Sequence, residues 1–455
     1  MKGNSRLRQI LAPGLIIMLG LAFAAGAQTY PNSTFQPHSE FGRMIDFLWN
    51  RLLLIGTIVF VLVEGALIYV VFRYRRKGPE TTEKPPQTHG HALLEVVWTI
   101  IPAVILIFIA VPTVKTIFKT EARVAAGALQ IEVIGHQWWW EFRYPEYKIT
   151  TANEIYLPVG RTVNFKLNSN DVIHSFWTPQ LGGKRDVIAN RTNYIWYTPD
   201  SSMKSAVWNG FCTEYCGTSH AKMRFRVFTV QPAEFASWVA GQQKPAAFGS
   251  SVASLPGGQA TAPSGGEPKT SGTGAAGGAA PAIVRPKGSL VPGADSIAAP
   301  APSNGVVLAS LPAGYIFPRN QAEFDYAKPH TPVPGDLHFT KGLTGSAARG
   351  MQVYSSAACI GCHAIAGNPS SVGNVGPNLT HVGSRATLGA GSFPNTPAYL
   401  ALWIKNARKM KSGILMPTLG LNEFDPQLKN PVTKAMGGLD DQQIADIVAY
   451  LSTLK

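Results

Sequence analysis

The four cysteines of this 455-residue chain form two close pairs, and each pair is followed by other side chains that bind metals. Cys212 and Cys216 are followed by His220 and Met223, and His174 lies upstream. Two thiolates, two imidazoles and a thioether form a soft ligand set that suits copper. Methionine is not a usual zinc ligand, and five ligands exceed the four of one tetrahedral zinc site. Two thiolates on one loop can instead bridge two metal ions. The cluster therefore predicts a copper site.

The second pair has the spacing that attaches a c-type haem, Cys359-x-x-Cys362-His363. Two thiols then bond to the vinyl groups, and the histidine becomes the proximal iron ligand. A redox-active or zinc-binding pair is the alternative. We expect Met416 as the sixth ligand, with Met410 as the other candidate, because His–Met ligation raises the potential and suits a donor to copper. Disulfides are the usual interpretation of an even cysteine count in an exported protein, but these spacings favour sites.

The pattern Cys-x-Glu-x-Cys-x-x-x-His-x-x-Met, preceded by a distant His-Ser, resembles the binuclear copper A centre of cytochrome c oxidase subunit II. The resemblance implies a cupredoxin fold in which two cysteines bridge the coppers, each histidine binds one copper and the methionine is a weak ligand. The implied copper ligands are His174, Cys212, the Glu214 backbone carbonyl, Cys216, His220 and Met223. The Glu214 carboxylate is then free for a magnesium or manganese ion shared with subunit I.

Residues 135–140, Gly-His-Gln-Trp-Trp-Trp, resemble the aromatic segment that this family places beside the copper centre. The resemblance implies that electrons enter at Trp138, and ordinary packing is the better interpretation of Trp139. Consecutive residues of a strand face opposite sides, so these tryptophans cannot all be core. We expect at least one of them to be exposed.

Two long apolar runs predict membrane-spanning helices over Leu52–Phe72 and Leu93–Val114. Their helical lengths, about 31 and 33 Å, match a hydrocarbon core of about 30 Å. Basic residues directly follow the first run and place the connecting loop in the cytoplasm, so both flanks lie outside; they are Arg73, Arg75, Arg76 and Lys77.

Each span carries one acid, and intramembrane carboxylates are costly enough to be functional candidates. The start of the second span, Glu95 to Pro102, is similar to the second helix of the same family, which implies that Glu95 lies near the mouth of a proton channel. An acid at a helix start in the headgroup region is an equally good interpretation of Glu95. Glu64, in the first span, is expected to face a partner subunit, and its role stays open.

Residues 1–27 have the pattern of a signal peptide, with basic residues, an apolar run over Ile10–Ala24 and Ala25-Gly26-Ala27 as cleavage site. A retained helix is the alternative, but the run is short for a span. Residues 28–114 then form an N-terminal segment and the transmembrane hairpin.

Residues 115–244 predict an all-β, cupredoxin-like sandwich. Arg161–Leu167 alternates apolar and polar residues, as a half-buried strand does. The segments 130–144, 193–197 and 225–230 supply further β-rich sequence.

Residues 245–340 predict a flexible linker, because 45 of the 66 residues in 245–310 are Gly, Ala, Pro or Ser and cannot build a core. Aromatic residues near its end, Tyr315, Phe317, Phe324 and Tyr326, suggest that this part packs against something. Residues 341–455 resemble a small all-α class I cytochrome c. Gly376 to Leu379 is similar to the loop that supports the proximal histidine, and Leu439–Leu451 has the spacing of a terminal helix.

The predicted function is an electron relay in which a donor reduces the haem, the haem reduces the copper pair, and copper A passes the electron to subunit I, where oxygen is reduced and protons are pumped. Both globular domains are basic, with 15 Lys and Arg against 10 Asp and Glu in 115–244 and 10 against 5 in 341–455. No acidic patch for steering a soluble cytochrome is evident, so the tether is expected to supply the donor at an effective concentration of about a millimolar.

The resemblance also implies partners and a location. Expected partners are oxidase subunits I and III, a cytochrome or quinol-oxidising complex as donor, and lipid, with no nucleic acid. The expected location is the bacterial inner membrane, with both domains on the periplasmic side. Alternatives are a Sco-type copper chaperone, nitrous oxide reductase, a quinol oxidase subunit II and an independent electron-transfer protein. A Sco-type chaperone would lack Met223, the tryptophan segment and the haem pattern. Nitrous oxide reductase carries many histidines for a second copper cluster, whereas this chain has 10. A quinol oxidase subunit II keeps the two spans and loses the copper ligands.

Overall fold

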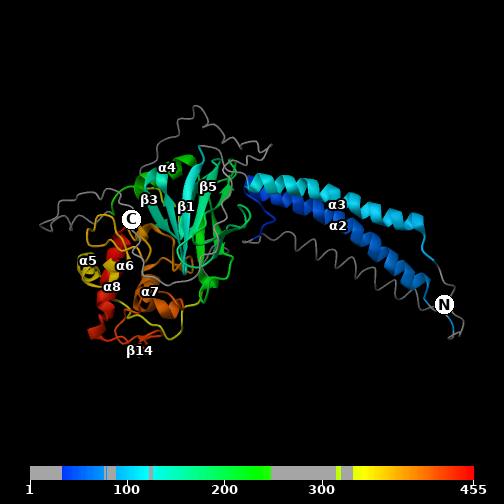
Figure 1. The fold of residues 1–455 in the computed structure, drawn as a ribbon. Helices are drawn as coiled ribbons and strands as arrows, with labels where there is room; N and C mark the ends of the chain where they lie inside the picture. Colours follow the sequence, from blue (N-terminus) through cyan, green and yellow to red (C-terminus); the bar gives the residue numbers. More distant parts are fainter. Residues whose placement is uncertain (1–32, 76–77, 79–88, 122–126, 247–313, 319–330) are drawn as a thin grey trace, which may run out of the picture.

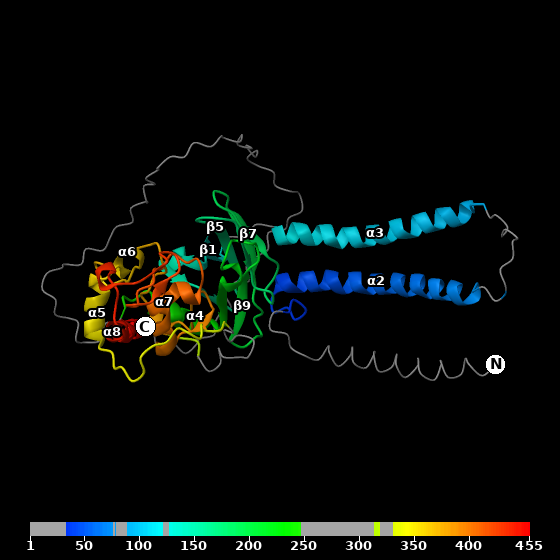
Figure 2. The ribbon, with the colours of Figure 1, turned by 90° about the horizontal axis from the view of Figure 1, so that it is seen from below.

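The computed structural model describes residues 33–75, 78, 89–121, 127–246, 314–318 and 331–455. Three parts follow one another in space: a pair of long helices, two packed β-sheets and a C-terminal helical domain (Figures 1 and 2). The expected multidomain class, with a helical hairpin, an all-β sandwich and a small all-α domain, is confirmed. The predicted signal peptide and most of the predicted linker lie outside the described residues.

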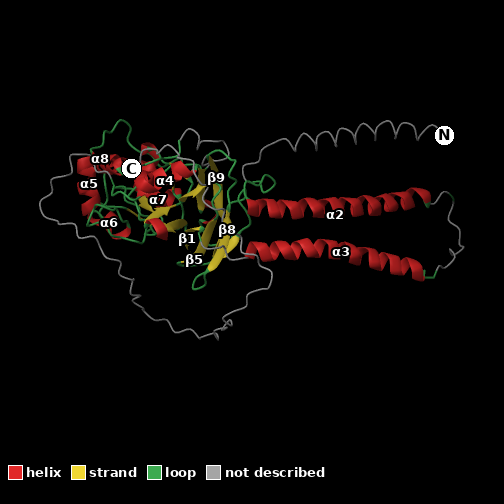
Figure 3. Ribbon diagram, turned by 90° about the horizontal axis from the view of Figure 1, so that it is seen from above, coloured by secondary structure: helices red, strands yellow, loops and turns green. Residues whose placement is uncertain are grey.

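The helical hairpin consists of α2 (Glu40–Arg73) and α3 (Ala92–Glu121), which run side by side away from the sheets (Figure 3). Their apolar side chains are exposed along most of their length, and α3 has no buried residue in the described structure. Both helices are long and apolar enough to cross a membrane. They are also longer than the predicted spans, because each continues past its apolar run toward the sheets, where Lys119 Nζ lies 2.7 Å from Glu40 Oε1.

The sandwich is built from two five-stranded sheets. The first has the order β3 (Ile149–Ala152), β2 (Trp139–Tyr144), β1 (Leu129–His136), β5 (Val163–Ser169) and β8 (Asn193–Tyr197). The second has the order β4 (Glu154–Pro158), β10 (Arg224–Val230), β9 (Ala206–Cys212), β6 (His174–Trp177) and β7 (Arg185–Val187). Alternation along β5 places Val163, Phe165 and Leu167 in the core, as predicted.

One feature of this domain was not predicted. A helix, α4 (Pro232–Gln242), follows the last strand and begins at a capping box between Gln231 and Glu234. The expected packing of the aromatic residues near the end of the linker is confirmed for residues 314–318, where the ring centroid of the buried Phe317 lies 5.2 Å from that of Phe228. The end of the predicted linker is therefore attached to the sandwich at this point; Phe324 and Tyr326 lie outside the described residues.

The C-terminal domain packs α5 (Ala347–Ser356) against α8 (Asp441–Thr453), with α6 (Cys359–Cys362) and α7 (Pro397–Met410) beside them. Two short strand pairs complete it, β11 (Thr387–Leu388) with β12 (Phe393–Pro394) and β13 (Phe424–Asp425) with β14 (Asn430–Pro431). The helix crossing requires Gly350, because a Cβ there would lie 1.9 Å from the Asp446 carbonyl oxygen. The predicted terminal helix over Leu439–Leu451 corresponds to α8.

Candidate functional site

The loop between β9 and β10 gathers most of the predicted copper ligands. β9 ends at Cys212, β10 begins after Met223, and the Cys212 backbone N–H donates to the Met223 carbonyl at 3.0 Å, which closes the loop. A 3₁₀ turn over His220–Lys222 turns His220 back toward the cysteines. The distant His174 arrives from the neighbouring strand, because β6 pairs with β9 and sets Phe176 opposite Cys212.

All six predicted donor groups converge. The sulfur atoms of Cys212 and Cys216 lie 3.7 Å apart. The shortest ligand contacts to these sulfurs are His174 Nδ1 to Cys212 at 3.8 Å, the Glu214 carbonyl to Cys212 at 3.2 Å, His220 Nδ1 to Cys216 at 3.6 Å and Met223 Sδ to Cys216 at 3.8 Å. Two central sulfurs, with one imidazole beside each, form an arrangement in which the thiolates can bridge two soft metal ions.

The alternative of a disulfide does not fit this geometry. A disulfide holds its sulfurs about 2.05 Å apart, and all four cysteines of the chain are free. Cys212 and Cys216 are both buried, and the hydrogen bond between the two thiols lowers the pKa of Cys212 and raises that of Cys216. One thiol is therefore prepared to lose its proton when a metal binds.

The ring of His174 is fixed by a residue that the sequence did not single out. Nε2 of this buried histidine donates to Asp171 Oδ1 at 2.8 Å, which leaves Nδ1 facing the sulfurs. Burial opposes the charge of His174, but the hydrogen bonds to Asp171 and Cys212 outweigh it and raise the histidine pKa. A carboxylate behind a ligating imidazole orients the ring and strengthens the ligand.

The tryptophan segment forms a hairpin tip against the copper loop. β1 ends at His136 and β2 begins at Trp139, so Trp138 lies in the turn and not on a strand. Its Nε1 donates to the Cys216 carbonyl at 2.9 Å, and Gln137 Nε2 donates to the same oxygen at 2.7 Å. Trp138 is thereby joined to the backbone of a predicted copper ligand.

The expectation that at least one of the three tryptophans is exposed is wrong. Trp140 is in the core, Trp139 is half-buried and stacks on His136 at 4.2 Å, and Trp138 is only 8% exposed. The physical reason is the C-terminal domain, whose Gly413 lies over the Trp138 ring so closely that a Cβ there would be 2.8 Å from Cη2. The docked C-terminal domain therefore covers Trp138, the side chain that strand alternation predicted to be exposed.

The haem-attachment motif lies on one wall of a cavity. Cys359 and Cys362 form α6, and His363 ends it. His363 Nδ1 donates to the Pro377 carbonyl at 2.8 Å, so that Nε2 is the nitrogen left to bind iron. Burial lowers the pKa of His363 and keeps the ring neutral, as a ligand must be. Gly376 lets the supporting loop approach, because a Cβ there would lie 2.5 Å from His363 Cε1.

The cavity has a volume of about 340 Å³ and is lined mostly by apolar side chains. Both cysteines, His363 and Met416 line it, whereas Met410 is fully buried in the core of the domain. The residues present therefore fit a covalent haem, and of the two candidate methionines only Met416 lies on the cavity wall.

Replacing Met416 by Leu is expected to lower the haem reduction potential by a substantial part of the roughly 0.8 V that axial ligands span. Leucine keeps the volume and removes the sulfur. Met410→Leu is the matched control, because it changes a core contact and leaves the cavity wall as it is. A redox titration of both variants, followed by haem absorbance, checks this. Equal potentials for wild type and Met416→Leu, or a large shift only in Met410→Leu, would reverse the assignment.

The remaining predicted residues lie apart from these sites. The Glu214 side chain is exposed beside the copper loop, although its carbonyl faces Cys212. Glu95 is in the first turn of α3, about 39 Å of helix from the end that meets the sheets. Glu64 is half-buried on α2. Both acids thus belong to the hairpin and not to the copper region.

Sequence reasoning missed three charged residues between the domains: Glu154, Arg385 and Lys411. Glu154 and Lys411 are buried and Arg385 is half-buried, and desolvation lowers the pKa of Arg385 to about 10 and that of Lys411 to about 7. Arg385 and Lys411 also line the haem cavity. No local pattern marks them, since their partners lie in another domain.

Three family patterns match the chain. "Cytochrome C oxidase subunit II, transmembrane domain" matches residues 32–116, "Cytochrome C oxidase subunit II, periplasmic domain" matches 148–230 and "Cytochrome c" matches 347–455. The first two imply a membrane protein with a periplasmic domain that holds copper A, and the third implies a haem.

Individual relatives agree with these matches. Cytochrome c oxidase subunit 2 of Alkalihalophilus pseudofirmus is 26% identical over 91% of this chain and 89% of its own length. A probable cytochrome c oxidase subunit 2 of Rickettsia conorii is 32% identical over 48% of this chain and 73% of its own length. Among solved structures, the periplasmic domain of subunit II of cytochrome oxidase from Bradyrhizobium japonicum is 31% identical over 27% of this chain and 97% of its own, with a TM-score of 0.25.

Proposed function

This chain belongs to the cytochrome c oxidase subunit II family and carries a cytochrome c domain at its C-terminus, and from this premise we propose that it relays electrons from an external donor to oxidase subunit I. It is thus part of a haem–copper oxidoreductase. In the proposal, subunit I reduces oxygen to water and pumps protons. When bound, the copper pair and the haem supply the one-electron chemistry.

The observation that carries the proposal is the position of the two candidate donor sets on the two sides of Trp138. On one side, Trp138 donates to the Cys216 carbonyl. On the other, it lines the same cavity as Cys362 and His363. Trp138 is therefore the residue we propose for electron arrival at copper, as the family resemblance also implies.

The chain's own residues hold and orient the cofactors in this proposal. The ligands for copper A are His174, Cys212, the Glu214 carbonyl, Cys216, His220 and Met223, and those for haem are Cys359, Cys362, His363 and Met416. The exposed Glu214 carboxylate is free to bind a magnesium or manganese ion shared with subunit I. Asp171 and the Pro377 carbonyl fix the imidazoles of His174 and His363.

The proposal includes a membrane setting. The hairpin α2–α3 would span the bacterial inner membrane, with subunits I and III and lipid around its exposed apolar side chains. Glu95, at the end of the hairpin far from the sheets, would lie on the cytoplasmic side near a proton path, and Glu64 would face a partner subunit. The donor is a cytochrome or a quinol-oxidising complex, and no nucleic acid takes part.

Truncation after Lys244 tests the relay. Both spans and all copper ligands remain, so the copper centre should assemble, while electron supply from the physiological donor slows sharply. Soluble cytochrome should restore turnover only at high concentration, roughly the millimolar range that a tether supplies. Copper content and oxygen uptake of the purified complex are the measurements. Full turnover with micromolar soluble cytochrome would show that the C-terminal domain is not the obligatory donor.

The same purification distinguishes an oxidase subunit from an independent electron-transfer protein. The full-length chain, solubilised and isolated, should bring subunit I with it. Recovery of a fully loaded chain without any oxidase subunit would favour the independent protein.

A further inference from the structure

Two buried charged side chains cross the boundary between the copper domain (127–246) and the C-terminal cytochrome domain (331–455), one in each direction. Glu154 extends from the first position of β4 into the cytochrome domain. Lys411, the residue after α7, extends into the copper domain. They are 3% and 2% exposed, which is rare for either residue type.

Glu154 is satisfied by groups of the other domain. Its Oε1 accepts the backbone N–H of Ala386 at 2.9 Å, the backbone N–H of Thr387 at 2.8 Å and the Thr387 hydroxyl at 3.0 Å. The positive charges of Arg385 and Arg226 lie beside the carboxylate. Three donors on one oxygen fix both the position and the angle of the β11 segment.

Lys411 makes the reciprocal contact. Its Nζ donates to the Trp138 carbonyl at 2.6 Å and to the Gly389 carbonyl at 3.2 Å, so it joins the hairpin tip of one domain to the β11–β12 turn of the other. The described structure gives Lys411 no ion pair with a carboxylate.

Further hydrogen bonds between the two domains lie on either side of Lys411. Lys222 Nζ donates to the Met410 carbonyl at 3.0 Å, and the Ser219 hydroxyl donates to the Ser412 carbonyl at 2.6 Å. Residues 410–413 thus lie directly on the copper loop. The haem cavity lies between the two charged contacts and has walls from both domains, including Trp138 and Trp139.

We propose that Glu154 and Lys411 form a reciprocal clamp that holds the cytochrome domain in one orientation on the copper domain and keeps Trp138 covered, so that soluble donors do not reach copper directly. The clamp follows from the contacts alone, and its consequence for donors rests on the proposed function. A buried charge is satisfied only where its partners stand in the right places, so the clamp specifies orientation as well as attachment.

Amide hydrogen exchange on the intact oxidase complex tests the clamp without reference to activity. Glu154→Ala should speed exchange of the Ala386 and Thr387 amides by about tenfold or more, since it removes a charged acceptor from two buried donors. Glu154→Gln keeps one carbonyl oxygen and should show a smaller increase. Lys411→Met should speed exchange around Trp138 and Gly389 similarly.

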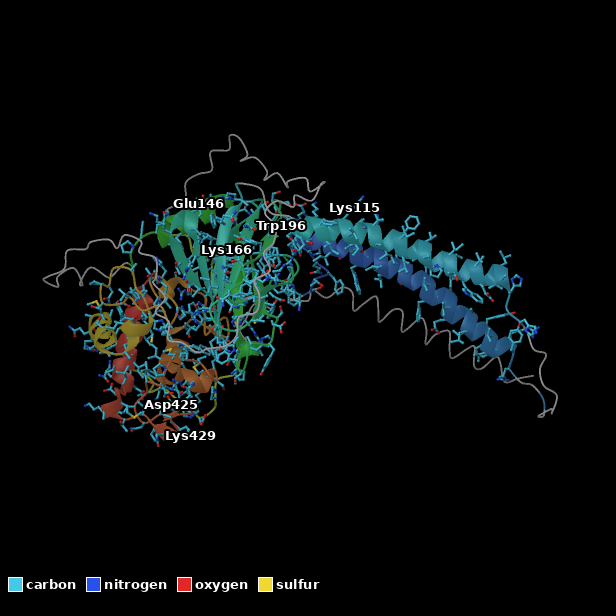
Figure 4. All side chains as sticks on the ribbon, viewed as in Figure 1. Lys115, Glu146, Lys166, Trp196, Asp425 and Lys429 are labelled. Carbon is cyan, nitrogen blue, oxygen red and sulfur yellow. The ribbon has the colours of Figure 1, made fainter. Side chains whose placement is uncertain are left out.

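Two exposed residues serve as matched controls. Glu146 lies at the edge of the copper domain and Lys429 at the outer end of the cytochrome domain (Figure 4), and Glu146→Ala and Lys429→Met should leave exchange at the interface unchanged. Wild-type protection of the β1 and β5 amides shows that a variant copper domain is still folded. Unchanged protection at Ala386 and Thr387 in Glu154→Ala, with β1 and β5 intact, would overturn the clamp.

Rapid mixing with a reduced soluble cytochrome tests the consequence for donors. In wild type, copper reduction should follow haem reduction and reach a rate independent of donor concentration. In the Glu154→Ala, Lys411→Met double variant, internal transfer should slow by about tenfold or more, and a direct copper phase proportional to donor should appear. Faster exchange without either kinetic change would reject the covering of Trp138 and leave the clamp standing. A wild type that transfers no electrons would reject the proposed function, while exchange would still decide the clamp.

Discussion

Replacing Cys216 by Ser is expected to abolish the copper centre while leaving the haem attached. Cys216 contacts Cys212, His220 and Met223, so it occupies the middle of the donor set. A serine hydroxyl stays protonated at neutral pH and is a hard ligand, so it cannot replace a bridging thiolate. The loss of copper affinity should exceed the roughly 10–100-fold that changes behind the ligands produce. Copper content and the near-infrared absorption measure it.

Thr218→Ser is the control for this variant, because Thr218 is an exposed residue of the same loop. It should retain both copper and the near-infrared absorption. Haem staining should be equal in the two variants, since the cytochrome motif is untouched. Copper at the wild-type level in Cys216→Ser would reject the copper assignment.

Loss of Cys359, Cys362 or His363 is expected to prevent normal haem incorporation. The residues line a cavity of about 340 Å³. Without the haem, the apolar side chains that line this cavity lose their packing partner, which destabilises the domain. The cytochrome domain should therefore lose both its haem and its compact fold. Covalent haem staining on a denaturing gel and the rate of limited proteolysis after residue 331 measure the two losses.

His338→Ala, a change at an exposed histidine of the same domain, is the matched control and should keep full staining and resistance. The copper site should survive loss of the haem, because its ligands come from the β-sandwich alone, and it should still accept electrons from an artificial donor. Wild-type staining and spectrum in His363→Ala would contradict the haem site.

The net charges of the two domains do not predict the interface between them. Both domains are basic, and their totals predict no attraction. The structure nevertheless joins them through Glu154, which accepts backbone N–H groups of the cytochrome domain, and Lys411, which donates to the Trp138 carbonyl of the copper domain. Backbone donors and acceptors do not appear in a charge count, so composition cannot detect this interface.

What the sequence determined by itself is the chemistry that is local along the chain. Cys212, Cys216, His220 and Met223 lie within one loop, and the haem motif occupies five residues, so connectivity alone keeps the ligands together. The two long apolar helices could also be predicted, since a candidate membrane span is recognised from length and hydropathy alone. Each of these features can be predicted without knowing which distant residues pack against it.

Only the tertiary structure decided the features that depend on distant partners. It placed Trp138 in a turn under Gly413, where the strand pattern suggested an exposed face. It put Met416 on the wall of the cavity and Met410 in the core, at the last residue of α7. Strand pairing and domain docking join residues far apart in sequence, and hydrophobic periodicity carries no record of which partners meet.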